Sequence, residues 1–209
     1  MPEECAYCGS REKLTRDHIP PRSLFGRPRP NDLITVPSCY PCNNGISKDD
    51  EYFNLFVKLG IDRDRFPKEN ADSVETIKNL ARPRSRGFAA SLAQKYVRGR
   101  PGGFSIDRSR VDAVLRRIVR GLFYYHAGTR MPASVSFEIV WIEEQKGVAA
   151  AVKGEIDALA RNPYVLGASV FRYAFRGGSD FVSEWLLNFY DHRRFFCLTF
   201  SNALVAAEA

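Results

Sequence analysis

Two pairs of cysteines constrain this 209-residue chain more than any other feature. Each pair has the spacing Cys-x-x-Cys, and thirty residues separate the first pair, Cys5 and Cys8, from the second, Cys39 and Cys42. Two cysteines at this spacing can place both sulfurs on one tetrahedral ion. Residues 1–5 lack the basic and apolar segments of an export signal, so we expect metal binding rather than disulfides.

Four thiolates saturate a tetrahedral zinc ion and leave no coordination position for a substrate. We therefore expect a structural zinc, which would stabilise a segment too short to be held by its own core. A rubredoxin-like iron site uses the same ligands and is the alternative. The fifth cysteine, Cys197, lies in the apolar run Phe-Phe-Cys-Leu and is predicted to be a buried structural thiol.

Charge and hydropathy favour a protein that works in the cytoplasm on a polyanion. The chain is 44% hydrophobic, which is enough for a core, but no run of eighteen apolar residues predicts a membrane span. The net charge is +7, so nucleic acid is the favoured partner and an anionic membrane surface the less favoured one. Residues 82–120 carry eleven Lys or Arg and two Asp, a pattern that also fits an ordinary solvated surface.

Hydrophobic periodicity predicts mixed helices and strands. Two short strands at 14–19 and 33–36 precede a helix at 48–60, and a Gly- and Pro-rich segment at 98–103 is the best domain boundary. Asn43 or Asn44 can cap the helix that follows them. Residues 185–187 fit a helix as well as a strand. The other expected elements are helices at 73–80, 89–97, 109–125 and 147–160, and strands at 135–142, 169–175, 181–190 and 195–201.

The residues between the cysteine pairs point to a family. The sequence Asp17-His18-Ile-Pro-Pro lies in the enclosed loop, and Asn43 follows directly on Cys42. In these features, and in a lysine nearby, residues 4–50 resemble the HNH endonucleases. The resemblance implies a treble-clef-like ββα-metal unit at 1–60, followed by a basic helical connector at 61–108 and a C-terminal α+β domain at 109–209 with a small, mostly antiparallel sheet. The expected fold class is α+β.

The resemblance also implies a catalytic set. Asp17 and Asn43 would hold one divalent ion, and His18 would be the general base of a hydrolysis that leaves a 5′ phosphate and a 3′ hydroxyl. Oxygen ligands suit Mg²⁺ or Mn²⁺, and the cation would neutralise charge that develops on the phosphate. An imidazole with a pKa near 6.5 can accept a proton from water at neutral pH. The roles of Asn43 and Asn44 could be exchanged.

One position departs from the family pattern. A middle asparagine that usually braces the loop carrying the histidine is replaced by Ile34, and we expect Asn31 to substitute for it. Asp49, Asp50 and Glu51 are expected to stabilise the first turns of their helix through its dipole rather than to bind metal. His126 and His192 are expected to be structural or exposed.

Several cations are candidates for contacts with DNA phosphates. Arg22 and Lys48 lie near the predicted site, and Arg116, Arg117 and Arg120 share one face of the helix at 109–125. The alternative is that these residues are ordinary exposed cations with no role in binding.

The sequence thus favours a metal-dependent DNA endonuclease of the HNH type. The competing hypothesis is a noncatalytic, zinc-stabilised nucleic-acid-binding module, and RNA cleavage or a protein-binding zinc domain are further alternatives. A homodimer stays open, because a dimer would make double-strand cleavage by a one-metal site easier to explain.

Overall fold

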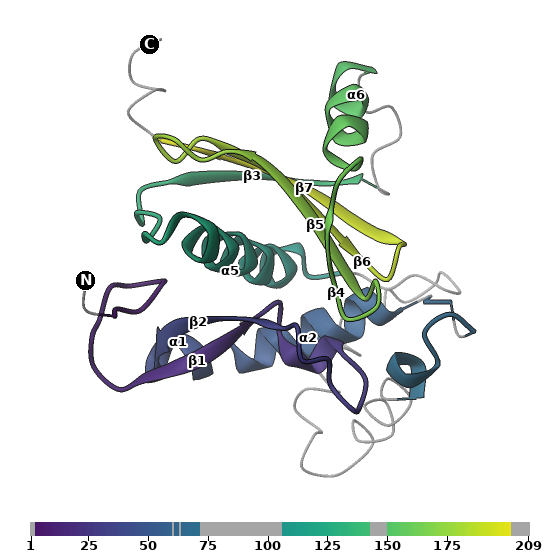
Figure 1. Ribbon diagram of the computed structural model, residues 1–209, viewed down its shortest axis with the longest axis horizontal. Coiled ribbons are helices and arrows are strands. Elements are labelled where there is room, and N and C mark those ends of the chain that lie inside the picture. Colours follow the sequence, from purple (N-terminus) through teal and green to yellow (C-terminus); the bar gives the residue numbers. More distant parts are fainter. Residues whose placement is uncertain (1–2, 60, 63, 72–105, 143–149, 202–209) are drawn as a thin grey trace, which may run out of the picture.

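A computed structural model describes residues 3–59, 61–62, 64–71, 106–142 and 150–201 of the chain. It contains helices and two antiparallel sheets, which confirms the α+β class (Figure 1). The predicted helices at 73–80 and 89–97 and the domain boundary at 98–103 lie outside the described residues. The division into three parts at residues 60 and 108 therefore stays a prediction.

The cysteine-rich segment folds into a hairpin followed by two helices. Strands β1 (Leu14–Ile19) and β2 (Ile34–Cys39) pair antiparallel, with the short 3-10 helix η1 (Arg22–Leu24) in the loop between them. Helices α1 (Tyr40–Asn44) and α2 (Ser47–Lys58) follow. The expectation that Asn43 or Asn44 caps α2 is wrong, because α2 begins after Ile46 without a side-chain cap.

Helix α5 (Arg108–Ala127) lies between this hairpin and the larger sheet (Figure 1). The predicted apolar spacing is confirmed, since the side chains at its i, i+3 and i+4 positions are buried, among them Val111, Val114, Leu115, Ile118 and Leu122. Gly128 ends the helix at φ +67°, in the left-handed region that glycine adopts without strain. The helix is therefore covered on two sides, and it separates the two sheets. No helix among the described residues is long and apolar enough to cross a membrane.

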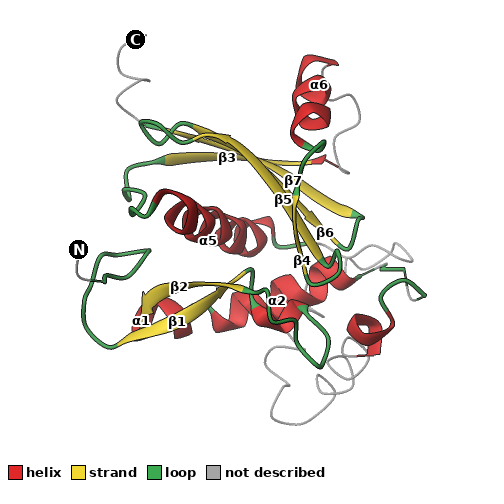
Figure 2. Cartoon of the chain, in the orientation of Figure 1, coloured by secondary structure: helices red, strands yellow, loops and turns green. Residues whose placement is uncertain are grey.

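The larger sheet has five antiparallel strands in the order β3-β7-β6-β5-β4. Their bounds are β3 Ser136–Trp141, β4 Tyr164–Leu166, β5 Phe171–Gly177, β6 Ser183–Phe189 and β7 Arg193–Phe200. Helix α6 (Ala150–Leu159) lies on the side of the sheet away from α5 (Figure 2). Residues 185–187 belong to β6, so their helical alternative is wrong. The sequence did not predict β4, which is too short to show a period.

Alternation along β6 explains how the sheet is covered on both faces. Trp185 and Leu187 are part of the main core, whereas Leu186 packs with Ile156 of α6 and with Phe196 in a second cluster. The main core continues through α5 and α2 to the hairpin. Cys197 is fully buried in it, as the sequence predicted.

The approach of α5 to the hairpin depends on a glycine. A Cβ atom added to Gly121 would lie 2.6 Å from Cδ1 of Ile19 in β1. Carbon atoms in contact are normally about 3.5–4.0 Å apart, so a larger residue here would force the helix and strand apart. Gly121 thereby lets the backbone of α5 pack directly against the strand that carries Asp17 and His18.

Candidate functional site

The four cysteines at the end of the hairpin form one cluster. The sulfur atoms of Cys5, Cys8, Cys39 and Cys42 all lie within 4.8 Å of one another, and those of Cys8 and Cys39 are 3.6 Å apart. Tetrahedral zinc with bonds of about 2.3 Å requires sulfurs roughly 3.8 Å apart. The donor set and its spacing therefore fit a zinc ion.

Backbone hydrogen bonds bring the two cysteine pairs together. The amide of Ala6 donates to the carbonyl of Pro37 at 2.8 Å, which ties the first pair to β2. The amide of Gly9, at φ +79°, donates to the carbonyl of Cys5 at 2.9 Å and closes the turn. Burial raises the pKa of the Cys5 thiol, but hydrogen bonds from backbone amides outweigh it and lower this pKa to about 6. Cys5 thus readily supplies one thiolate, whereas burial raises the pKa of the Cys42 thiol in the same cluster.

A separate cleft of about 350 Å³ lies beside the hairpin. It gathers all three residues to which the sequence assigned catalysis, together with residues to which it did not. The residues that line the cleft are Arg16, Asp17, His18, Pro21, Arg22, Ser23, Asn43, Asn44, Ser47 and Asp50. The side chain of Lys48 is exposed, and Lys48 does not line the cleft.

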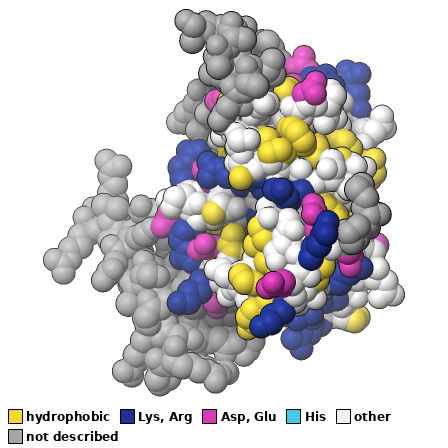
Figure 3. Space-filling view, turned by 90° about the vertical axis from the view of Figure 1, so that its left-hand side faces the viewer, with side chains coloured by type: hydrophobic (Ala, Val, Ile, Leu, Met, Phe, Trp, Pro, Cys, Tyr) yellow, Lys and Arg dark blue, Asp and Glu magenta, His cyan; other side chains and the backbone are white. Residues whose placement is uncertain are grey.

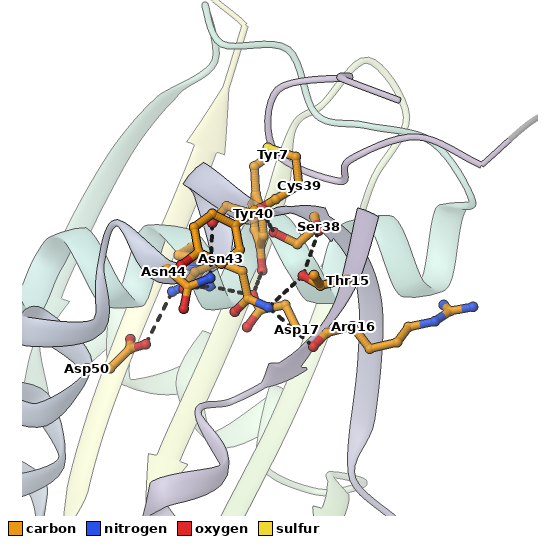
Figure 4. A network of polar contacts seen from close by, with 11 residues as sticks. Tyr7, Thr15, Arg16, Asp17, Ser38, Cys39, Tyr40, Asn43, Asn44 and Asp50 are labelled. Carbon is orange, nitrogen blue, oxygen red and sulfur yellow. Dashed lines mark hydrogen bonds and ion pairs between the residues drawn. The ribbon is translucent and has the colours of Figure 1, made fainter. Parts of the chain in front are cut away.

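Asn43 is fixed against β1 by its amide nitrogen. This nitrogen donates to Oγ1 of Thr15 at 2.8 Å and lies 3.4 Å from the carbonyl of Arg16 (Figure 4). Thr15 in turn donates to the carbonyl of Ser38 at 2.8 Å, so its Oγ1 is oriented to accept. Because the amide nitrogen is engaged with the strand, the amide oxygen of Asn43 stays available as a ligand.

Asp17 is buried, with 7% of its surface exposed, and one of its oxygens has two partners. Oδ2 accepts a hydrogen bond of 2.5 Å from the Tyr7 hydroxyl and one of 2.7 Å from Nη2 of Arg117. Among the described residues, Oδ1 forms no hydrogen bond or ion pair. Asp17 therefore has one oxygen bound by the protein and one that can bind a cation.

His18 is half-buried at the same cleft. Burial and the positive charge of Arg22 lower the pKa of the imidazole, and the negative charge of Asp17 acts in the opposite direction. The ring is therefore neutral at neutral pH, which is the state required of a group that accepts a proton.

Asp50 lines the cleft, whereas Arg117 contacts Asp17 without lining it. The sequence reasoning assigned Asp50 to the helix dipole and Arg117 to DNA phosphates, and so it missed the contacts of both with the site. Nη1 of Arg117 lies 3.3 Å from Oδ2 of Asp50, so one guanidinium bridges two carboxylates. Burial raises the pKa of Asp50 to about 6, against the lowering effect of Arg117. Arg117 lies three residues after Val114 and four before Gly121, both buried, so helical spacing places it beside the buried face, but the sequence alone does not show that the hairpin packs there.

The prediction that Arg116, Arg117 and Arg120 share an exposed face of the helix is wrong. Only Arg116 is exposed, whereas Arg117 is 9% exposed and turned toward the hairpin. Arg120 is half-buried and donates to the carbonyls of Met131 and Pro132 at 3.0 and 2.9 Å. The contacts of Arg117 and Arg120 are internal because the helix is covered on two sides.

The predicted DNA contacts of Arg22, Lys48 and Arg116 stay predictions. Figure 3 shows Lys and Arg side chains interspersed with acidic and apolar ones on one face of the molecule.

The loop between β1 and β2 is not braced as the sequence predicted. Asn31 is exposed, and its side chain forms no hydrogen bond with the residues that the structure describes. Instead, Nζ of Lys58 in α2 donates to the carbonyl of Ser23 at 3.2 Å, and the hydroxyl of Tyr190 donates to the carbonyl of Leu24 at 2.5 Å. Residues distant in the sequence thus perform the role expected of a local asparagine.

The other two histidines lie away from the cleft. Nε2 of His126 is 3.0 Å from the hydroxyl of Tyr173, and that of His192 is 3.2 Å from the carbonyl of Leu59. Of the three histidines of the chain, only His18 lines the cleft with Asp17 and Asn43.

Comparison with known proteins adds a family to this geometry. No curated protein and no solved structure matches the chain significantly. A family model described as HNH endonuclease matches residues 5–49, a segment that begins at the first cysteine and ends in the first turn of α2. This segment includes Asp17, His18 and Asn43, whereas Asp50 and Arg117 lie outside it. Residues 5–49 therefore carry the HNH endonuclease motif, in a form whose four clustered cysteines fit the zinc-binding subtype.

Proposed function

We propose that this protein is an HNH endonuclease that hydrolyses DNA phosphodiester bonds with the help of a divalent ion. The observation that carries the proposal is the single cleft shared by Asp17, His18 and Asn43, inside the segment that matches the HNH family. A carboxylate, an imidazole and an amide oxygen are the groups that such a hydrolysis needs in one place.

Two oxygens of the cleft suit Mg²⁺ or Mn²⁺. Oδ1 of Asp17 has no partner among the described residues, and the amide oxygen of Asn43 is left available by the bonds of its nitrogen to β1. Hard cations prefer oxygen ligands of this kind and retain water in their remaining positions. When bound, the ion would supply positive charge for the phosphate oxygens and for the departing 3′ oxygen.

His18 would act as the general base. A water molecule between its ring and the phosphorus gives its proton to the neutral imidazole and forms the new phosphorus–oxygen bond. The bond to the 3′ oxygen breaks, and this oxygen takes a proton from solvent water, so the products carry a 5′ phosphate and a 3′ hydroxyl. General-base catalysis contributes on the order of 10²–10⁴ in rate. Arg22, which is exposed at the rim of the cleft, would bind a phosphate beside the one that is cut.

Plasmid cleavage tests the proposal. Purified protein is incubated with supercoiled, relaxed and linear DNA in Mg²⁺ or Mn²⁺, and nicked and linear products are measured over time. We expect His18→Ala to lose at least about 100-fold in rate. His192→Ala is the matched control, because His192 is remote from the cleft, and it should cut like the wild type. Equal cutting by His18→Ala, or no cutting by the wild type with any metal or DNA form, would contradict the proposal.

A second candidate function is a noncatalytic, zinc-stabilised nucleic-acid-binding module. The observation that favours it is the ion pair between Asp17 and Arg117, because a carboxylate held by an arginine has less capacity for a metal. This candidate predicts DNA binding that needs the zinc cluster but shows no cleavage and no dependence on Mg²⁺. The described residues give no support for a homodimer, and RNA as a substrate is tested by the same assay with labelled RNA.

A further inference from the structure

We infer that Arg117 is a positioning residue for the nuclease site, which holds one oxygen of Asp17 so that the other faces the divalent ion. The inference rests on the proposed function and adds to it a residue from far outside the family-matched segment. It gives the C-terminal half of the chain a part in the site.

The contacts of the guanidinium support this role. Nη2 of Arg117 donates to Oδ2 of Asp17 at 2.7 Å and lies 3.5 Å from the backbone oxygen of Asn43. Nη1 lies 3.3 Å from Oδ2 of Asp50. One planar group thus contacts both residues proposed as metal ligands and the second carboxylate of the cleft. A carboxylate whose Oδ2 accepts hydrogen bonds from both a rigid guanidinium and the Tyr7 hydroxyl has little freedom to rotate.

The guanidinium is held in place from several directions. Arg117 is only 9% exposed, and its Cζ lies 5.2 Å from the ring centroid of Tyr7. The Tyr7 hydroxyl donates to the same Oδ2, at 2.5 Å. The α5 backbone that carries Arg117 is fixed by the fully buried Val114 and by the close contact of Gly121 with β1. These contacts make the orientation of Asp17 a property of the tertiary fold.

The competing effect of Arg117 is electrostatic repulsion. A guanidinium next to a metal ligand reduces the negative charge of the site, and charge alone would make a divalent ion bind more weakly in its presence. Positioning and repulsion therefore predict opposite signs for removal of the arginine. Groups that orient metal ligands typically contribute about 10–100-fold to metal affinity.

Metal binding, measured apart from cleavage, separates the two effects. Free Mn²⁺ is quantified by electron paramagnetic resonance in titrations of the zinc-loaded full chain, with Asp17→Asn as the baseline for loss of the site. We expect Arg117→Met to weaken Mn²⁺ binding about 10–100-fold and Arg117→Lys, which retains one donor, to recover part of the loss. Arg116→Met is the matched control, because it removes the same charge from the exposed neighbouring position and should leave the affinity unchanged.

Each outcome decides the inference. Unchanged or tighter Mn²⁺ binding by a folded Arg117→Met overturns it in favour of a structural or purely repulsive role. If Arg117→Met loses its zinc or its fold, Arg117→Lys decides, because lysine keeps the positive charge and lacks the planar guanidinium that contacts Asp17 and Asp50. Weaker Mn²⁺ binding by Arg117→Lys then supports positioning, and unchanged binding overturns it. If the wild type shows no Mn²⁺ binding that depends on Asp17, the proposed function is refuted as well. If the wild type binds Mn²⁺ and Arg117→Met binds it with the same affinity, only this inference is refuted.

Discussion

Two glycines in helices should respond in opposite ways to the same substitution. Gly121 of α5 faces Ile19, and an added Cβ would lie 2.6 Å from Cδ1 and 2.7 Å from Cγ1 of that side chain. Gly154 of α6 is exposed, and an added Cβ would meet nothing within 4 Å. Because alanine is the better helix former by about 1 kcal/mol, Gly154→Ala should raise the free energy of unfolding by roughly that amount.

Gly121→Ala gains the same helix propensity but adds a methyl group to a filled core. Ile19 is 1% exposed, so its side chain is enclosed by other residues and cannot move aside into solvent. Overpacking of this kind costs roughly 1–3 kcal/mol. The two variants should therefore differ in stability by about 1–3 kcal/mol. Gly121→Ala should also cut DNA more slowly than Gly154→Ala, because Arg117 lies one turn away on the same face of α5.

Urea unfolding followed by circular dichroism measures both stabilities. A double variant, Gly121→Ala with Ile19→Val, lacks the Cδ1 atom and should recover part of the loss relative to Ile19→Val alone. Equal stabilisation by Gly121→Ala and Gly154→Ala would refute the close packing of α5 on β1. It would also remove one of the supports of the Arg117 position.

Three further predictions concern the metal cluster, the half-buried carboxylate of Asp50 and two arginines. The wild type should bind one zinc per chain by elemental analysis. Cys8→Ser should lose this zinc and unfold at a lower urea concentration, whereas Cys197→Ala should keep it. Zinc retention by Cys8→Ser would contradict the cluster. The pKa of Asp50 is raised to about 6, so its ionisation destabilises the fold as the pH rises from about 4 to 6. The unfolding free energy of Asp50→Asn minus that of the wild type should therefore increase by at most about 3 kcal/mol between pH 4 and pH 7. If this difference is the same at both pH values, the prediction is refuted. Arg22→Gln should reduce the slope of log affinity for DNA against log salt by about 0.9. Arg120→Gln should leave this slope unchanged and lower the free energy of unfolding by about 1–3 kcal/mol, because it leaves carbonyl groups unpaired. The reverse pattern would assign Arg120 to the DNA-binding surface.

Local sequence predicted most of the elements and the metal cluster. Helix α5 and strands β1, β3, β5, β6 and β7 follow from apolar periods of 3.6 and 2 residues, which depend only on neighbours along the chain. The spacing of the cysteines predicts the metal cluster for the same reason, since each pair is one tight turn. Strand β4 and helix α1 have three and five residues, too few to show a period.

The tertiary structure alone decided what surrounds the candidate site. Asp17 and Arg117 are one hundred positions apart, and their ion pair exists because α5 packs against β1 at Gly121. Lys58 and Tyr190 hold the loop that the sequence assigned to Asn31. Whether a charged side chain is exposed or buried depends on what its helix packs against, and no period within the helix states that. The sequence therefore predicted candidate groups for the chemistry, and long-range packing decided which of them meet and in what orientation.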